Sequence, residues 1–471
     1  MDSMIFLAVA SSVLSLLFTP LVRNLALRLD LVDEPDHNRK IHKVPIPRIG
    51  GVAVVAASVG AYALLPIFKL GEGVAAGVAS VNSLLLPVLV IFCVGLIDDI
   101  FEIRPWYKLI TQIFAASLAW SGGIHLSEIA GHDLPRIVSL LLTILWIVAC
   151  TNAINLIDGV DGLAGGAALF ATVTMLIAAL FHHNMGLAFA TIPLAGALLG
   201  FLRFNFSPAS IFLGDCGSLT LGFLLGCYGI FWTEKSTTWL GMAAPLMALS
   251  VPLLDVSLAI VRRSVRQQPI FKADREHIHH KLLSQGLPPW RVVLILYGFC
   301  GLASIAGLTL TATQLPYRGL VVIVAFVVAW VGIQRLGYSE LDLAERVAFG
   351  GRIPQRTKEQ LRVKRFEQEL LESKTLEDAW HVLSKASPDF GFSGIEWRID
   401  GEVRISRRGS GRQTRLDFPG RGYILLTRET KSKTAASSGA LFADCVGRVF
   451  FDRLNELDLS RQEEALYASA K

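Results

Sequence analysis

The stretch LLLPVLVIFCVGLIDD, residues 84–99, decides the class of this fold, because an uninterrupted apolar run ends in two adjacent aspartates. A helix that crosses a membrane needs about 20 mostly apolar residues. Similar runs occur at 4–22, 51–68, 107–121, 137–154, 162–181, 186–202, 218–233, 239–261, 292–312 and 319–336. The sequence therefore predicts an all-α, multi-pass membrane protein with about eleven transmembrane helices.

The charged residues are concentrated behind the apolar runs. Only 18% of the 471 residues are charged, against roughly 25% in soluble domains, yet 44 of the 83 charged residues lie in 340–471. We therefore expect a membrane domain over 1–339, a linker over 340–356, a soluble domain over 357–460 and a tail over 461–471. The net charge of +5 requires no nucleic-acid partner, because basic residues beside spans are normally an orientation signal.

The basic residues of the loops indicate how the chain is oriented in the bilayer. With the N-terminus outside, the inner loops hold fifteen Lys and Arg residues and the outer loops hold four. Cytoplasmic loops carry such an excess, and eleven spans then place the soluble domain in the cytoplasm. We find no internal repeat, which disfavours an inverted-repeat transporter.

Acidic and histidine side chains gather at the run ends that this orientation places on the cytoplasmic face. Carboxylates at membrane depth cost about a few kcal/mol each and therefore point to a function. Several converging acids suit a hard cation such as Mg²⁺, whereas a solvated helix cap explains only a single acid. The clusters are Asp98 with Asp99, Asp158 with Asp161, Asp215, and the group His277, His279 and His280.

Three basic or histidine segments admit two interpretations each. The HIHH stretch at 277–280 lacks the ligands of a zinc site, so with Arg275 it is suited to bind a diphosphate, and the alternative is a solvated basic loop. Lys40 lies in a loop that could bind substrate or anchor at anionic headgroups. Lys108 could contact a phosphate, or its ammonium could snorkel to the interface.

These motifs resemble those of the polyprenyl-phosphate N-acetylhexosamine-1-phosphate transferases, integral enzymes that start cell-envelope polysaccharides. The matching pieces, in the order of the family, are LIDD at 96–99, NAINLIDGVDGLAGG at 152–166, FLGDCGS at 212–218 and HIHH at 277–280. Because Ile278 interrupts the histidines and Lys281 follows them, the chain is more similar to the UDP-GlcNAc branch than to the phospho-N-acetylmuramoyl-pentapeptide branch.

The resemblance implies transfer of a sugar-1-phosphate from a UDP-N-acetylhexosamine to undecaprenyl or another polyprenyl phosphate, with release of UMP, at the cytoplasmic face of the bacterial inner membrane. It also implies Mg²⁺, or Mn²⁺ in its place, with Asp215 as the first direct ligand and Asp99 as the next. Asp98 is the family's proposed base, although a nucleophile or an orienting group also fits. The other expected catalytic and substrate-binding residues are Asp99, Asp158, Asp161, His279, Lys40, Lys108, Asn152, Asn155, Asn205, Arg275, His277 and His280.

The main alternative is an ion- or proton-coupled membrane transporter, in which the aspartates would carry the coupling ion. Transporter sites usually lie near the bilayer midplane. The aspartates of this chain instead fall at the ends of the apolar runs, and this position favours the enzyme. A homodimer is compatible with either function.

The segment after residue 356 predicts a small α+β domain. A charged amphipathic helix is expected over 357–386, and a last helix is expected over 440–459. Between them, IEWRID and EVRISR are joined through Asp400 and Gly401, which favour a type I′ hairpin, and LDFPG and GYILLTRE follow. We expect a truncated, GAF-like module that regulates the enzyme or binds a cytoplasmic partner or ligand.

Overall fold

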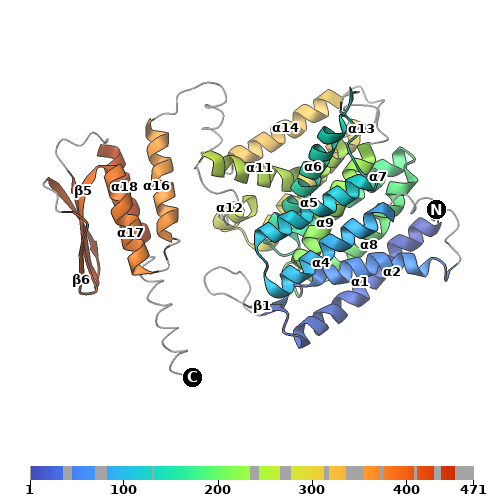
Figure 1. Ribbon diagram of the computed structural model, residues 1–471, viewed down its shortest axis with the longest axis horizontal. Helices are drawn as coiled ribbons and strands as arrows, with labels where there is room; N and C mark the ends of the chain where they lie inside the picture. The colour runs from blue at the N-terminus through green and yellow to red at the C-terminus, as the bar shows by residue number, and fades with distance from the viewer. Residues whose placement is uncertain are drawn as a thin grey trace. The chain divides into compact units, whose positions relative to one another are not determined.

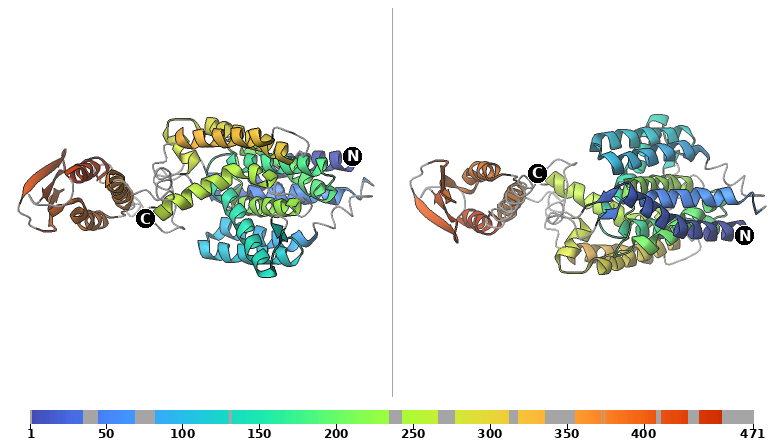
Figure 2. Two further views of the ribbon diagram at one scale, coloured as in Figure 1. Left: turned by 90° about the horizontal axis from the view of Figure 1, so that it is seen from above. Right: turned by 90° about the horizontal axis from the view of Figure 1, so that it is seen from below.

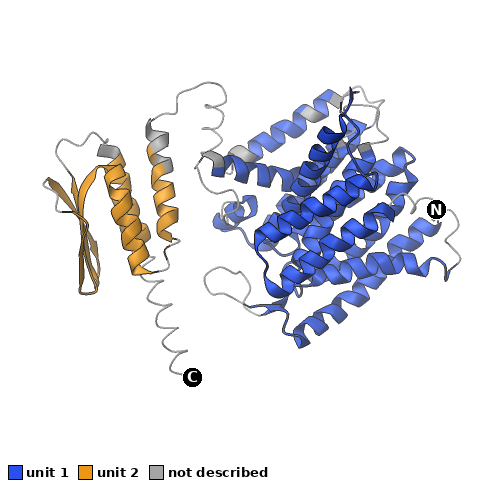
Figure 3. Cartoon of the chain, viewed as in Figure 1, with its two compact units in different colours: residues 1–263, 269–338 blue, residues 264–268, 339–471 orange. Residues whose placement is uncertain are grey.

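The computed structural model describes residues 2–34, 45–68, 82–129, 132–233, 243–265, 277–311, 318–335, 355–371, 373, 375–407, 411–428 and 436–450. The chain divides into two compact units, residues 1–263 with 269–338 and residues 264–268 with 339–471 (Figure 3). In the described residues, the first unit is helical apart from two short strand pairs, and the second combines helices with a sheet.

The helices of the first unit run alongside one another, as views from different directions show (Figures 1 and 2). Two-residue ladders pair β1 (Val32–Asp33) with β2 (Ile46–Pro47), and β3 (Glu128–Ile129) with β4 (His132–Asp133). The helices are α1 (Asp2–Arg28), α2 (Gly50–Leu64), α4 (Leu85–Phe101), α5 (Pro105–Ser121), α6 (Arg136–Ile157), α7 (Leu163–Phe181), α8 (Met185–Asn205), α9 (Gly214–Thr233), α10 (Ala243–Ala248), α11 (Ser250–Val265), α12 (Ile278–Ser284), α13 (Pro289–Thr311) and α14 (Arg318–Arg335).

Seven helices in the described part of the chain are long and apolar enough to cross a membrane. They are α1, α4 with the preceding turn (Asn82–Leu84), α6, α7, α8, α9 and α13. Gly50–Leu64 and Gly319–Gly332 are shorter apolar helices. The first unit is therefore a multi-pass membrane domain, and the count of eleven spans stays a prediction.

The expected span over 239–261 consists of two helices in its described part, because α10 ends at Ala248 and α11 begins at Ser250. Pro252 explains the break. It has no N–H, so the carbonyl of Ala248, four residues earlier, has no helical donor. The described part of this expected span is therefore a broken helix.

Close helix contacts at glycines bring the polar helix ends together. Helix α9 packs against α4 and α6. A Cβ atom on Gly95 of α4 would lie 2.6 Å from the backbone of Asp215 and Cys216, and one on Gly222 of α9 would lie 2.6 Å from the Cα of Thr151. Small residues allow backbones to approach closely in membranes, and here they place the C-terminal ends of α4 and α6 beside the N-terminal end of α9.

The second unit contains a four-stranded antiparallel sheet in the order β6-β5-β8-β7, with helices on one face (Figures 1 and 2). The strands are β5 (Phe392–Ile399), β6 (Glu402–Ile405), β7 (Arg412–Phe418) and β8 (Gly422–Arg428). Asp400 and Gly401 have φ of 53° and 81°, and Ile399 pairs with Glu402. Both central residues of a type I′ turn need positive φ, so the predicted hairpin is confirmed.

The helices of the second unit are α16 (Gln355–Leu371), α17 (Leu376–Ala386) and α18 (Ala436–Cys445), which continues as a π-helical turn over Val446–Phe450. The expected single helix over 357–386 is thus two helices, because Thr375 and Asp378 form a capping box that starts α17. Trp397 and Phe442 are buried in the core between sheet and helices. The end of the expected last helix, 451–459, lies outside the described residues.

Candidate active site

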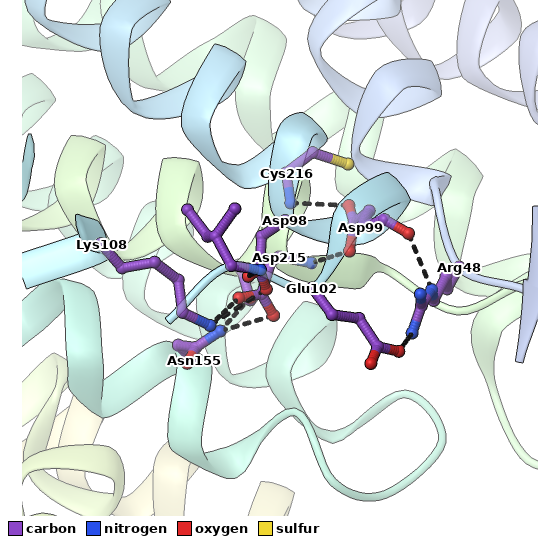
Figure 4. A network of polar contacts seen from close by, with 10 residues as sticks. Arg48, Asp98, Asp99, Glu102, Lys108, Asn155, Asp215 and Cys216 are labelled. Atoms are coloured by element: carbon purple, nitrogen blue, oxygen red, sulfur yellow. Dashed lines mark hydrogen bonds and ion pairs between the residues drawn. The ribbon is translucent and has the colours of Figure 1, made fainter. Parts of the chain in front are cut away.

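Three helix ends bring two carboxylates to one ammonium group (Figure 4). Asp98 lies in the last turn of α4, Lys108 in the first turn of α5 and Asp215 in the first turn of α9. The Nζ atom of Lys108 is 3.0 Å from Oδ2 of Asp98 and 2.8 Å from Oδ2 of Asp215. One positive charge is thus shared by two negative charges, which leaves the centre acidic.

The short connection between α4 and α5 brings Lys108 within reach of Asp98. Oδ1 of Asp98 accepts a hydrogen bond of 2.9 Å from the N–H of Ile103. Glu102 has a left-handed φ of 50°, which ends α4. Pro105 is the first residue of α5, where its missing N–H costs nothing. Asp98 and Lys108 therefore meet across a tight turn.

Asp99 accepts hydrogen bonds from the first backbone N–H groups of α9. Its Oδ1 binds the N–H of Asp215 at 2.7 Å and its Oδ2 binds the N–H of Cys216 at 2.9 Å. Gly214 has φ of +74°, and a Cβ atom on it would lie 2.8 Å from Oδ2 of Asp99. A carboxylate at this end satisfies orphan donors and meets the positive end of the helix dipole. Asp99 therefore positions Asp215.

Arg48 holds the same region from the segment before α2. Its Nε donates to the carbonyl of Asp99 at 2.9 Å, and its Nη1 lies 3.1 Å from Oε1 of Glu102 (Figure 4). The sequence placed Arg48 in the basic loop of Lys40, for which substrate binding and anchoring at headgroups were the two interpretations. Its hydrogen bond to the backbone carbonyl of Asp99 leaves no pattern in the sequence, because the two residues lie in distant segments.

Amide side chains of α6 face α5 and α9. Nδ2 of Asn155 donates to Oδ1 of Asp215 at 3.0 Å and to Oγ of Ser218 at 2.9 Å. Nδ2 of Asn152 donates to Oε1 of Gln112 at 2.6 Å. Asn155 therefore belongs to the carboxylate centre, while Asn152 links α6 to α5.

Asp158 and Asp161 lie in the turn between α6 and α7. Burial and the negative charges of Asp215 and Asp99 raise the pKa of Asp158 well above its usual range, which places Asp158 in the same electrostatic neighbourhood. Oδ2 of Asp161 accepts a hydrogen bond of 2.9 Å from the N–H of Ala209. Asp161 thereby ties this turn to the segment before α9.

The histidine segment lies against the same turn. A Cβ atom on Gly159 would be 3.1 Å from Nε2 of His279. Burial lowers the pKa of His279 to about 3, with the nearby His280 adding to the effect, so this imidazole is neutral at neutral pH. The ring centroids of His279 and His280 are 4.3 Å apart. Asp255 of α11, which the sequence analysis did not select, contacts His277.

Among the expected substrate-binding residues, one holds a loop and two lie outside the described part of the chain. Lys40 and Arg275 lie outside the described residues. Asn205 is 2% exposed, and its Nδ2 donates to the carbonyl of Ile211 at 2.9 Å. Asn205 therefore closes the loop between α8 and α9.

The donor chemistry at the centre suits a hard divalent cation. In the part of the chain that the structure describes, no group of three or more His, Cys, Asp or Glu side chains is arranged to hold a metal. Asp98 and Asp215 nevertheless converge on one positive charge, and carboxylate oxygens are preferred Mg²⁺ ligands. The oxygens of Asp98 and Asp215 that bind Lys108 would hold such a cation once the ammonium group moved aside, whereas both oxygens of Asp99 accept backbone hydrogen bonds that fix helix α9.

Comparison with known proteins covers the membrane domain. The model of glycosyl transferase family 4 matches residues 81–233, which include the five aspartates expected from the sequence but not Asp255. The chain is 32% identical over 305 residues to the probable undecaprenyl-phosphate N-acetylglucosaminyl 1-phosphate transferase of Bacillus subtilis, covering 64% of this chain and 83% of the relative.

Two other relatives extend this similarity. The decaprenyl-phosphate N-acetylglucosaminephosphotransferase of Mycobacterium tuberculosis is 35% identical over 319 residues, which are 60% of this chain and 76% of that protein. The phospho-N-acetylmuramoyl-pentapeptide-transferase of Latilactobacillus sakei is 30% identical over 237 residues, which are 46% of this chain and 72% of that protein. The named activities are all phosphosugar transfers.

Proposed function

This chain belongs to the polyprenyl-phosphate N-acetylhexosamine-1-phosphate transferases of glycosyl transferase family 4, and on that premise we propose that it transfers N-acetylglucosamine-1-phosphate from UDP-N-acetylglucosamine to undecaprenyl phosphate or a similar polyprenyl phosphate. An oxygen of the acceptor phosphate forms a bond to the sugar-linked phosphorus of the donor, and the bond from that phosphorus to the UMP oxygen breaks. The products are a polyprenyl-diphosphate sugar and UMP.

The observation that carries this proposal is the convergence of Asp98 and Asp215 on Lys108. Both substrates are anionic, and an acidic centre would repel them. A divalent cation held by Asp98 and Asp215, with Mg²⁺ as the first candidate and Mn²⁺ as the second, would offset that repulsion. Lys108, which would move aside when the cation binds these oxygens, supplies a further positive charge next to it.

Asp98 orients the acceptor in this proposal. A phosphate monoester has a second pKa near about 6, so its dianion is already common at neutral pH and a base adds little. Both oxygens of Asp98 are also engaged, by the N–H of Ile103 and by Lys108. A base or nucleophile would need these contacts to break first.

The donor binds on the α6–α7 side of the centre. Asn155 is half-buried and binds Asp215 through its amide group, which also donates to the buried Ser218. The turn that carries Asp158 and Asp161 lies next to His279, which is 2% exposed. The N–H of a neutral imidazole can donate a hydrogen bond to the diphosphate, and its other nitrogen can accept one from the nucleotide, without adding charge.

The site lies at one end of four helices, and this position supports an enzyme at a membrane surface over a transporter. Asp98 and Asn155 are in the last turns of α4 and α6, whereas Lys108 and Asp215 are in the first turns of α5 and α9. We place this end at the cytoplasmic face of the bacterial inner membrane, with the N-terminus outside. The second unit, also cytoplasmic, would regulate the enzyme or bind a partner.

A direct assay tests the function. Purified protein is incubated with undecaprenyl phosphate, Mg²⁺ and a panel of UDP-sugars, and UMP is measured. We expect UMP release with UDP-N-acetylglucosamine, and none after chelation of the metal. Asp215→Asn retains the size of the side chain but removes its charge, so it should reduce the rate by at least about 100-fold. The absence of UMP with every sugar would refute the proposal.

A further inference from the structure

Asp255 is a buried carboxylate in helix α11. Its side chain is 2% exposed, and Asp255 follows SVPLL in the sequence. A carboxylate without compensation is costly in such surroundings, so it persists only where specific partners bind it. Its partners therefore indicate its function.

Both oxygens of Asp255 bind the start of helix α12. Oδ1 accepts a hydrogen bond of 2.9 Å from the N–H of Ile278, the first residue of α12. Oδ2 lies 3.1 Å from Nδ1 of His277, which is also buried. His277 is the N-cap residue of α12, but its side chain makes no capping hydrogen bond. Asp255, from α11, caps the helix instead.

This contact extends to the turn beside the carboxylate centre. The rings of His277 and His279 are stacked, with centroids 5.7 Å apart and planes 3° from parallel. His279 in turn lies against Gly159, between Asp158 and Asp161. A shift of His277 would therefore move His279 relative to this turn.

The pairing also selects the tautomer of His277. A carboxylate accepts hydrogen bonds and cannot donate them, so Nδ1 of His277 carries the proton that Asp255 binds. Nε2 is then the nitrogen with the available lone pair in the neutral ring, an arrangement by which carboxylates commonly orient functional histidines.

We propose that Asp255 is a positioning residue for transfer, which acts through His277 to hold the HIHH segment against the Asp158–Asp161 turn where the diphosphate of the UDP-sugar binds. This inference rests on the proposed function and assigns a task to a residue that contacts neither substrate. It explains why a carboxylate is buried in α11.

Two substitutions distinguish the hydrogen bond donated by the N–H of Ile278 from the contact with His277. In Asp255→Asn, the amide oxygen can still accept from Ile278, but the NH₂ group faces Nδ1 of His277 and forces the other tautomer. Asp255→Ala removes both contacts. We expect Asp255→Asn to raise KM for the UDP-sugar by about 10-fold or more while KM for polyprenyl phosphate is unchanged, and Asp255→Ala also to lower the thermal stability.

A double-mutant cycle tests whether Asp255 acts through His277. If it does, Asp255→Asn in a His277→Ala background should change KM for the UDP-sugar by less than about 2-fold, because coupled residues are non-additive. Ser257→Ala, which removes an exposed hydroxyl on α11 bound to the carbonyl of Leu253, is the control for the helix and should leave both KM values unchanged.

Multiplicative effects in the cycle, or equal increases in both KM values, would overturn the inference. If Asp255→Asn does not insert into membranes, His277→Ala alone must still raise KM for the UDP-sugar selectively, and failure to do so has the same consequence. An inactive wild-type protein would instead contradict the proposed function, so the two failures are distinguishable.

Discussion

Asp99 fixes the start of the helix that carries Asp215, because Oδ1 of Asp99 accepts a hydrogen bond of 2.7 Å from the backbone N–H of Asp215. Adjacent in sequence, Asp98 and Asp99 therefore have different tasks. Asp98 faces Lys108, whereas Asp99 holds the backbone of α9 (Figure 4). The carboxylate of Asp215 is placed by α9, so the geometry of the centre depends on Asp99 without any substrate contact.

Replacement of Asp99 tests this division of tasks. Asp99→Asn keeps one acceptor oxygen but turns an NH₂ group toward a backbone N–H and removes the charge at the helix N-terminus. We expect a loss of about 1–3 kcal/mol in stability, from the broken charged hydrogen bond, together with a large loss of UMP release. Unfolding is followed by tryptophan fluorescence on heating in detergent, which does not depend on activity. Glu102→Gln, at an exposed ion pair with Arg48, should change either quantity little.

Lys108 can be tested by charge and by shape. Lys108→Met removes the charge that Asp98 and Asp215 share, so we expect UMP release to fall by about 100-fold. Lys108→Arg keeps the charge in a planar group and should retain more activity. Arg104→Gln, at an exposed residue of the same connection, is the matched control. Equal activity of wild type and Lys108→Met would contradict a function at the phosphates.

The residues of the centre could be predicted from the sequence for two reasons: a charged side chain is energetically costly in an apolar run, and these residues all fall at run ends. Acids such as Asp98 and Asp215 are rare in apolar runs and fall at run ends, so hydropathy alone brings them to one face. The hairpin at Asp400–Gly401 can also be predicted from the sequence, because its type I′ turn depends on two residues that tolerate positive φ.

Other features depend on contacts between distant segments and could not be predicted this way. Asp99 and Asp98 are indistinguishable in sequence, although one caps α9 and the other binds Lys108. Asp255 looks like an isolated acid until α12 is placed beside it. Two local signals were overlooked: Thr375 with Asp378 marks a helix start, and Pro252 marks a helix break.

Tyr62 donates a hydrogen bond to a carbonyl of α8 that a proline leaves without its helical donor. Pro193 has no N–H, so the carbonyl of Phe189, four residues earlier, lacks its helical donor, and the hydroxyl of Tyr62 donates to it at 2.6 Å. Tyr62→Phe should therefore cost about 1–3 kcal/mol of stability. Tyr228→Phe removes a hydrogen bond of 3.2 Å to the carbonyl of Ala190, which retains a helical donor in Leu194, and should cost less. We expect the heat-inactivation midpoint of Tyr62→Phe to be lower than that of Tyr228→Phe, and the reverse order would contradict this prediction.

Stability should fall as the pH is lowered, through His279. Its pKa in the folded protein is about 3, against an ordinary value of 6.5. Between these values the unfolded chain binds the proton and the folded chain does not, so the stabilisation is complete above pH 6.5 and is lost as the pH falls toward 3. His279→Asn should flatten the dependence of thermal stability between pH 7 and about 5. Ser284→Ala, on the same helix, should keep the wild-type slope.

Removal of the second unit should leave the reaction intact. A stop codon after Tyr338 follows the division between the two units and removes none of the aspartates or histidines of the centre. Backbone groups of the membrane helices are satisfied within each helix, so the truncated protein should insert and release UMP at a rate comparable to that of the full chain. The second unit has its own core around Trp397 and Phe442, and residues 355–460 should unfold cooperatively when expressed alone. A truncated protein that inserts correctly but is inactive would mean that the second unit completes the active site.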